Sequence, residues 1–348
     1  MQKFVSVQDI DQKVIEKAQT KLDNLTKPLG SLGRLEELAK KICGITGSLH
    51  PSMADKVIFT LAGDHGVTAE MVSAYPKEVT AQMIYNFLNG GAGINVLAKH
   101  VGARVVVVDM GVASDLDHIE NLYIKKVGYG TKNMSKGPAM TRQEAIQSIQ
   151  MGIEVFNEEY CKGIHLAGTG DMGIGNTTPS AAIAAVCTGA PVEDVTGRGT
   201  GIEDAALRNK IEVIKKAIAI NKPDPKDAID VLSKAGGFEI GGLAGIILAA
   251  AEKRVPVVLD GFISGTAALI ACHIEPKIKE YLIAAHCSVE KGHKIILDHI
   301  GIKPVLDLNL RLGEGTGAAL AMSIVEASIK ILTQMATFET AHVSEKKA

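Results

Sequence analysis

One carboxylate stands among three glycines near the end of the chain, where Glu314 lies within Leu310-Arg311-Leu312-Gly313-Glu314-Gly315-Thr316-Gly317. Glycines allow a backbone to approach a ligand closely, and the alanine-rich helix expected to follow offers free N–H groups in its first turn. This setting suits a base beside a small ligand. It suits equally well a carboxylate that complements the helix dipole, an effect worth about 0.3–1 kcal/mol.

A second glycine-rich segment, Gly168 to Gly173, has the G-x-G-x-x-G spacing of dinucleotide sites and follows an expected strand. The rest of that fingerprint is missing, because the chain continues to Asn176, Thr177 and Pro179 and no acidic residue ends a strand about 20 residues later. The segment can instead offer backbone N–H groups before a helix that Pro179 opens. Segments 197–201 and 264–266 have the same character, so we predict at least one phosphate site.

Histidine and cysteine side chains suggest a metal site at first sight, because His286, Cys287, His293 and His299 are residue types that bind zinc. Their spacing matches no closed tetrahedral set, so we predict no metal and no cofactor. His65, between Asp64 and Gly66, is either an acid or base near neutral pH or a turn residue hydrogen-bonded to Asp64.

The elements that must position these residues are short β-branched runs, each followed by a polar or glycine residue and then a helix. Continuous apolar strands alternating with helices indicate a parallel sheet covered on both faces, and ligands bind such sheets at the carboxyl ends of the strands. We therefore predict an α/β, Rossmann-like parallel sheet of about six strands flanked by helices. The runs lie at residues 57–61, 105–108, 164–166, 255–259 and 281–285.

The two chain ends differ from this pattern, because residues 1–50 show helical spacing and a further helix runs from Gly317 to about Ala336. That helix is long enough to leave the sheet and pack on the N-terminal helices. We therefore predict a large α/β substrate-binding domain at 51–315 and a small helical domain built from 1–50 plus 316–348.

Composition excludes several classes of protein. The 348 residues carry a formal net charge of -2 and only 4% aromatic residues, which argues against a nucleic-acid partner. Five widely spaced cysteines without a Cys-x-x-Cys pair predict reduced thiols in the cytoplasm. We find no apolar run of membrane-spanning length in the sequence and expect no membrane association.

Together the motifs resemble the nicotinate-nucleotide:dimethylbenzimidazole phosphoribosyltransferase family, in order and from about residue 10 to 336. This family forms α-ribazole 5′-phosphate, the lower-ligand nucleotide of cobalamin, from nicotinate mononucleotide and a benzimidazole, and releases nicotinate with inversion at C1′. The resemblance also implies a homodimer. The motifs that carry it are Lys27-Pro28-Leu29-Gly30-Ser31-Leu32-Gly33, Ala62-Gly63-Asp64-His65-Gly66-Val67, Gly173-Ile174-Gly175-Asn176-Thr177-Thr178, Gly197-Arg198-Gly199-Thr200-Gly201, Leu259-Asp260-Gly261-Phe262 and Leu310 to Gly317.

The resemblance implies three catalytic positions. Glu314 would take the proton that the benzimidazole loses as it attacks C1′. Asp171 stands where the family has glutamate, and would either offset positive charge at C1′ or act through water. Lys210 matches a lysine near the family's active site, although a solvated charge on the helix from Glu203 to Ile220 explains it nearly as well.

The resemblance also implies substrate contacts. Phosphate and ribose would be bound by Gly173, Gly175, Asn176, Gly199, Thr200, Gly201, Ser264, Gly265 and Ser288, all expected in loops. The benzimidazole pocket would involve Ser73, Tyr75, Gln82 and Leu312.

Two other functions stay open on the sequence. One is an NAD-dependent oxidoreductase that uses Gly168 to Gly173, and the other is a non-catalytic nucleotide-binding protein that holds nicotinate mononucleotide without consuming it. A carboxylate between glycines favours catalysis. The preferred acceptor base is not fixed by the sequence.

Overall fold

Seven parallel strands form one sheet in the computed structural model, which describes residues 3–116 and 119–344. The α/β class predicted from the sequence is confirmed, with one strand more than the expected six. The two edge strands are only three residues long, which is too short for the apolar pattern of a strand to be recognised in the sequence. Across the sheet the order is β3 (Leu122–Ile124), β2 (Ala103–Gly111), β1 (Lys56–Gly63), β4 (Leu166–Met172), β5 (Val257–Leu259), β6 (Leu282–His286) and β7 (Pro304–Leu306).

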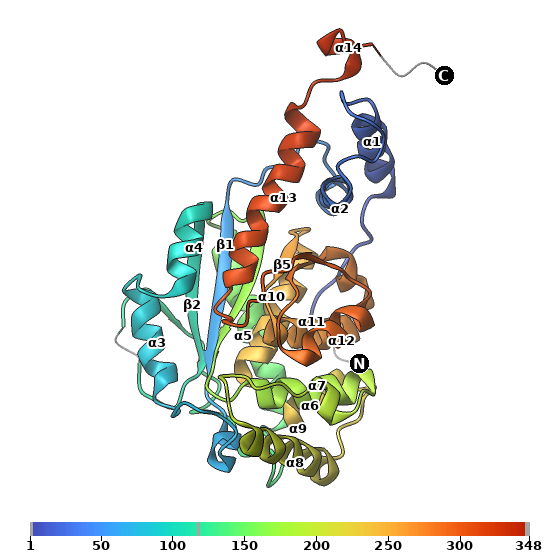
Figure 1. The fold of residues 1–348 in the computed structure, drawn as a ribbon. Coiled ribbons are helices and arrows are strands. Elements are labelled where there is room, and N and C mark those ends of the chain that lie inside the picture. The colour runs from blue at the N-terminus through green and yellow to red at the C-terminus, as the bar shows by residue number, and fades with distance from the viewer. Residues whose placement is uncertain (1–2, 117–118, 345–348) are drawn as a thin grey trace.

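Helices cover both faces of this sheet (Figure 1). Before β4 the chain forms α1 (Gln12–Asp23), α2 (Arg34–Thr46), the 3₁₀ turn η1 (Gly66–Glu70), α3 (Val79–Leu88), α4 (Gly93–Val101) and α5 (Arg142–Tyr160). After β4 it forms α6 (Thr177–Thr188), α7 (Val192–Val195), α8 (Asp204–Asn221), α9 (Ala228–Ala235), α10 (Phe238–Glu252), α11 (Phe262–Ile274), η2 (Pro276–Tyr281), α12 (Lys291–Ile300), α13 (Thr316–Gln334) and α14 (Phe338–Ala341).

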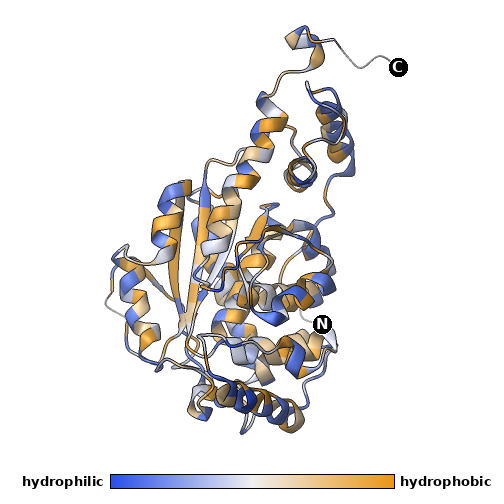
Figure 2. Cartoon of the chain, in the orientation of Figure 1, coloured by the Kyte–Doolittle hydropathy of each residue, from blue (hydrophilic) through white to orange (hydrophobic). Residues whose placement is uncertain are grey.

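Strand β1 shows why the sheet is buried on both sides, since all eight of its residues are buried. Val57, Phe59 and Leu61 belong to one hydrophobic core, which also contains residues of α5, α10 and α11. Ile58 and Ala62 belong to a second core, with residues of α2, α4 and α13. Side chains alternate between the faces of a strand, so a continuous apolar run fills both cores. Figure 2 shows β1 mainly in the colour of hydrophobic residues.

The Gly168 to Gly173 segment is mostly strand, because β4 runs to Met172 rather than ending near Leu166 as predicted. A Cβ atom on Gly168 would lie 2.8 Å from Met322 Cε of α13, and one on Gly170 would lie 2.3 Å from the Glu314 carbonyl oxygen. These glycines therefore let α13 and the Glu314 turn approach the sheet. Close packing explains the spacing that resembled a dinucleotide fingerprint.

The N-terminal helices α1 and α2 lie beside α13, which extends beyond the sheet (Figure 1). Thr26 N donates to the Ala336 carbonyl oxygen at 3.0 Å, and Phe338 N donates to that of Asn24 at 3.1 Å. The predicted helix from Gly317 to Ala336 is present as Thr316–Gln334. Contrary to our sequence analysis, α13 is long and apolar enough to cross a membrane by length and composition, but it packs on β4, β5 and β6 as a core helix.

The strand order reverses between β1 and β4, because the chain moves outward from β1 to β2 and β3 and then returns to continue from β4 to β7. At such a reversal the loops leaving two neighbouring strands diverge, which opens a crevice at the carboxyl ends. Residues Asp64 and His65 follow β1 there, and Gly173 follows β4.

Candidate active site

A cavity of about 540 Å³ lies at the carboxyl ends of the strands. Its walls come from the segments that follow β4, β5, β6 and β7, together with the 197–201 loop and the start of α3. The contributing residues fall within 72–83, 171–177, 199–200, 261–263, 286–290 and 311–314. A single cavity thus joins four strand exits that are far apart in the sequence.

The Glu314 turn has an unusual backbone, because Gly313, Glu314 and Gly315 all have positive φ, at 84°, 64° and 100°. A non-glycine residue rarely adopts this conformation, and such strain clusters at functional sites. The turn is held to the sheet by Thr60 Oγ1, which donates to the Glu314 carbonyl oxygen at 2.8 Å, and by Glu314 N, which donates to the Asp171 carbonyl oxygen at 3.2 Å.

The Glu314 side chain lines the cavity and is only 5% exposed. Its Oε2 accepts a hydrogen bond of 3.1 Å from Ile94 N, in the first turn of α4. The carboxylate therefore binds the N-terminus of α4. The dipole hypothesis had instead placed it at the N-terminus of α13, the helix that follows Glu314 in the chain. Burial raises the pKa of Glu314, partly opposed by the Ile94 hydrogen bond.

Asp171 lies near the end of β4, where its Oδ2 accepts a 2.8 Å hydrogen bond from Asn176 Nδ2. Burial and the nearby Asp260 carboxylate raise the pKa of Asp171 to about 8, with smaller contributions from Glu239 and Glu314. At neutral pH the group is therefore mainly protonated. This argues against a permanent negative charge at Asp171 and favours a neutral carboxyl in the cavity wall.

The segment 173–177 leads from β4 into α6, whose 12 residues begin at Thr177 and contain Pro179 as the third. Gly175 has a φ of 86°, and a Cβ atom on Gly173 would lie 2.4 Å from the Gly63 carbonyl oxygen, so both positions need glycine. Gly173, Gly175, Asn176 and Thr177 line the cavity. The N-terminus of α6 therefore faces the space in which a phosphate is predicted.

Lys210 is fully buried on α8 and is not the solvated charge that its position on a long helix also suggested. Its Nζ donates to Thr177 Oγ1 at 2.6 Å and to the Gly197 carbonyl oxygen at 3.4 Å. Burial lowers the pKa of Lys210 to about 8, although Glu290 raises it. A positive charge therefore lies directly behind the predicted phosphate cradle.

Two charged residues that sequence reasoning did not single out tie the 197–201 loop to the cavity. Glu290 Oε1 accepts a hydrogen bond of 2.9 Å from Gly199 N, and Arg311 Nη1 donates to the Gly199 carbonyl oxygen at 3.2 Å. The sequence signal for Glu290 was its place two residues after Ser288 at the exit of β6. Arg311 lay inside the Leu310 to Gly317 motif.

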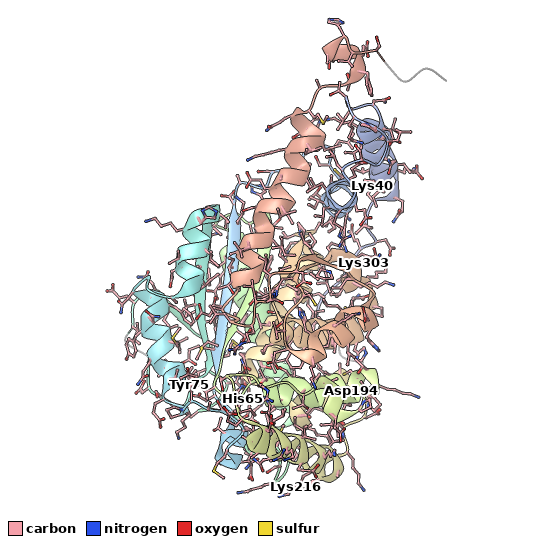
Figure 3. All side chains as sticks on the ribbon, in the orientation of Figure 1. Lys40, His65, Tyr75, Asp194, Lys216 and Lys303 are labelled. Atoms are coloured by element: carbon pink, nitrogen blue, oxygen red, sulfur yellow. The ribbon has the colours of Figure 1, made fainter. Side chains whose placement is uncertain are left out.

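The predicted benzimidazole residues lie partly in this cavity. Ser73, Tyr75 and Leu312 line it, and Thr200 Oγ1 accepts a 3.1 Å hydrogen bond from Ala74 N and lies 3.3 Å from Ser73 Oγ. Tyr75 is labelled in Figure 3 near the carboxyl end of the sheet. Gln82 is exposed on α3 and does not line the cavity.

Three predicted phosphate or ribose residues are not at the cavity wall. Ser264 and Gly265 lie inside α11 and are buried, because this helix already begins at Phe262, and residues 261–263 line the cavity instead. Gly201 also lies outside the lining. Ser288 does line the cavity, and its hydroxyl donates to the Leu310 carbonyl oxygen at 3.3 Å.

The histidines have partners other than a metal. His65 Nε2 lies 2.8 Å from Glu239 Oε1, so its partner is not Asp64, which instead accepts a hydrogen bond from Ala113 N. Burial lowers the pKa of His65, but the charge and hydrogen bond of Glu239, with the charges of Asp64 and Asp171, together outweigh it, so the net shift is upward. His293 accepts a hydrogen bond from Ser288 N, and burial lowers its pKa to about 3. Among residues 3–116 and 119–344 no three His, Cys, Asp or Glu side chains are grouped as metal ligands.

A Rossmann-like sheet with a helix N-terminus and a buried carboxylate at one cavity fits an enzyme that acts on a small anionic substrate such as a nucleotide. The family model described as phosphoribosyltransferase matches residues 7–343. The chain is 60% identical over 336 residues to the nicotinate-nucleotide–dimethylbenzimidazole phosphoribosyltransferase of Geobacter sulfurreducens, covering 97% of this chain and 96% of that protein. The protein of the same name from Desulforudis audaxviator is 56% identical over 338 residues, 97% of this chain and 96% of its own length.

Solved structures agree with this assignment. The crystal structure of CobT from Thermus thermophilus superposes with a TM-score of 0.93 at 43% identity, over 96% of this chain and all of that one. The chain therefore belongs to the nicotinate-nucleotide–dimethylbenzimidazole phosphoribosyltransferase family.

Proposed function

We propose that this protein transfers the phosphoribosyl group of nicotinate mononucleotide to 5,6-dimethylbenzimidazole or a related base. The products are α-ribazole 5′-phosphate, for the nucleotide loop of cobalamin, and nicotinate. The observation that carries the proposal is the buried Glu314 carboxylate, which the Ile94 amide fixes in the same cavity as the glycine cradle at 173–177. Membership of the family supports the same reaction.

The reaction needs a base more than it needs an acid, because the pyridinium nitrogen of the donor is already a good leaving group. One ring nitrogen of the benzimidazole attacks C1′ as the bond from C1′ to the pyridinium nitrogen breaks, and nicotinate leaves with that electron pair. The other ring nitrogen of the benzimidazole gives its proton to Glu314. Attack on the face opposite to nicotinate converts the β-nucleotide into an α-riboside. Burial strengthens Glu314 as a base by raising its pKa.

The phosphate of the donor fits at the start of α6. Backbone N–H groups of a helix N-terminus attract anions, and the buried Lys210 adds a full positive charge through Thr177. Tyr75 and Leu312 offer apolar surface to a flat heterocycle elsewhere in the cavity. The protein supplies binding, orientation and one proton acceptor.

The experiment that tests this function follows nicotinate release and α-ribazole 5′-phosphate by mass-resolved chromatography, with no metal added. We expect product from the wild-type protein and a loss of about 10²–10⁴-fold in kcat for Glu314→Gln. Glu339→Gln, near the far end of the chain, is the matched control and should keep wild-type turnover. Bound but unconsumed nicotinate mononucleotide would instead indicate the non-catalytic alternative. The oxidoreductase alternative is not favoured, because the Gly168 and Gly170 positions serve packing.

The oligomer and the compartment are further parts of the proposal. We expect a homodimer, as the family resemblance implies, and light scattering after size-exclusion chromatography tests it. We also expect a cytoplasmic protein, which the free state of all five cysteines supports.

A further inference from the structure

Asp260 follows β5 and is fully buried, outside the set of residues that line the cavity. Its Oδ2 accepts a hydrogen bond of 3.0 Å from Gly315 N, and its Oδ1 accepts bonds of 2.7 Å from Gly317 N and 3.3 Å from Ala318 N. One carboxylate thereby satisfies three amides, one at the N-cap of α13 and two in its first turn. The residue at the N-cap of α13 is Gly315, which has no side chain to do this.

The fit around this carboxylate is close. A Cβ atom on Gly317 would lie 2.8 Å from Asp260 Oδ1 and 2.1 Å from His286 Cδ2, so glycine is required where α13 approaches β5 and β6. Thr169 Oγ1 of β4 lies 3.3 Å from Asp260 N. Asp260 therefore joins the start of α13 to the middle of the sheet.

The residue immediately before this capped turn is Glu314. Its left-handed backbone, with a φ of 64°, is unfavourable for a residue with a side chain, so the neighbouring structure must hold it in place. Thr60 binds its carbonyl oxygen from one side, and Asp260 binds the next amide along the chain, that of Gly315. The carboxylate position thus depends on an anchor that never enters the cavity.

We infer that Asp260 is a positioning residue for Glu314, holding the first turn of α13 so that the base meets the acceptor nitrogen at hydrogen-bond distance. The inference rests on the proposed function, because it assigns Asp260 to the proton-accepting step of that reaction. Displacing a reacting group by about 1 Å can slow a reaction about 10²-fold. Loss of Asp260 therefore affects kcat far more than it affects donor binding.

The test is a double-mutant cycle of Asp260→Asn and Glu314→Gln, with kcat and KM measured for nicotinate mononucleotide and dimethylbenzimidazole. Asparagine keeps the size of Asp260 but replaces one acceptor oxygen with a donor, which faces backbone N–H groups. We expect Asp260→Asn to lower kcat at least tenfold and to change the KM for nicotinate mononucleotide less than twofold. In the Glu314→Gln background the same substitution should lower the residual kcat less than twofold, because the base it positions is already absent.

Two controls keep the outcome clear. Asp307→Asn removes an exposed carboxylate after β7 and should leave kcat unchanged in both backgrounds. Thr60→Val releases the Glu314 carbonyl oxygen while keeping Asp260, and should show the same non-additivity if Asp260→Asn fails to fold.

An equal further loss of kcat in the Glu314→Gln background would overturn the inference, as would a rise in donor KM with kcat unchanged. Absence of product from the wild-type protein would overturn the proposed function itself and this inference with it. That result is distinguishable because it appears before any variant is compared.

Discussion

Replacing Asp171 by asparagine should make the protein more stable, and increasingly so as the pH rises. The Asp171 carboxyl is 6% exposed, and its Oδ1 has no hydrogen-bond partner within the described chain. Its charged form faces the carboxylates of Asp260, Glu239 and Glu314, with Asn176 as the compensating donor. An asparagine oxygen can accept the same Asn176 hydrogen bond without bringing a charge into this cluster.

The magnitude follows from the shift in pKa. Asp171 has an ordinary pKa of 3.8 in the unfolded chain and a pKa of about 8 in the folded protein, so the folded protein holds a proton that the unfolded chain releases. The stabilising effect of that proton is complete below pH 3.8 and is lost as the pH rises toward 8. Each pH unit in this interval changes the free energy of unfolding by about 1.4 kcal/mol. The advantage of Asp171→Asn over wild type should therefore grow to as much as about 5 kcal/mol.

Urea denaturation of both proteins at pH 5, 6, 7 and 8 measures this difference. Asp307→Asn is the control, since the substitution is the same but the carboxylate is exposed, and its curve should follow wild type at every pH. Parallel curves for wild type and Asp171→Asn would refute the reasoning. An advantage that shrinks with rising pH would show that the site stabilises the Asp171 anion.

Three further predictions concern the cavity and its support. Lys210→Met should raise the KM for nicotinate mononucleotide at least tenfold. In the wild-type protein this KM should rise above pH 8, because Lys210 loses its charge as the pH passes its pKa of about 8. Steady-state kinetics from pH 6 to 9 measure this dependence, and a KM that does not change with pH would contradict the prediction. Gly315→Ala should lower the free energy of unfolding by about 2 kcal/mol more than Gly301→Ala does. Both glycines have positive φ, but a Cβ atom at Gly315 would lie 2.5 Å from Ile58, whereas one at Gly301 would have open space around it. Equal losses of stability in urea denaturation would contradict the steric explanation. Thr200→Val should raise the KM for dimethylbenzimidazole more than the KM for nicotinate mononucleotide, because the substitution removes the hydrogen bonds that hold the loop at 73–75. If the same kinetic assay shows a change only in the KM for nicotinate mononucleotide, Thr200 contacts the phosphate and does not position this loop.

The parallel, two-sided sheet was predictable because its central strands are buried on both faces. Residues 105–108 are all valine, and residues 57–61 are apolar except for Thr60; such runs mark interior parallel strands. The edge strands β3 and β7 have three residues each and are only partly buried, so they carry too few apolar positions to be recognised. Strand β4 was mistaken for a loop over Gly168 to Asp171, because its glycines accommodate α13, whose position the local sequence does not show.

The candidate site was predictable where a loop signal coincided with a chemical group. Glu314, Asp171 and Asn176 lie at strand ends and in glycine-rich turns, and the structure brings them to one cavity. Ser264 and Gly265 were expected in a loop but lie inside α11, because the sequence does not fix whether this helix begins before or after them.

Asp260 and Glu290 could not be assigned from sequence, since their partners are 55 and 91 residues away along the chain. The burial of Lys210 could not be predicted from the sequence either. Its depth on α8 depends on the 197–201 loop packing over it.

The packing of α13 on the N-terminal helices has a consequence for biosynthesis. Leu25 pairs with Thr337 as an isolated antiparallel bridge, and α13 packs on α2, so helices made first on the ribosome find their partners only when almost the whole chain has emerged. Contacts across such long sequence separations form late and slowly. Glu314 lies in the turn immediately before α13, and Asp260 joins that turn to the first residues of the helix. The proposed base therefore takes up its position only when α13 has docked on the sheet, among the last contacts to form.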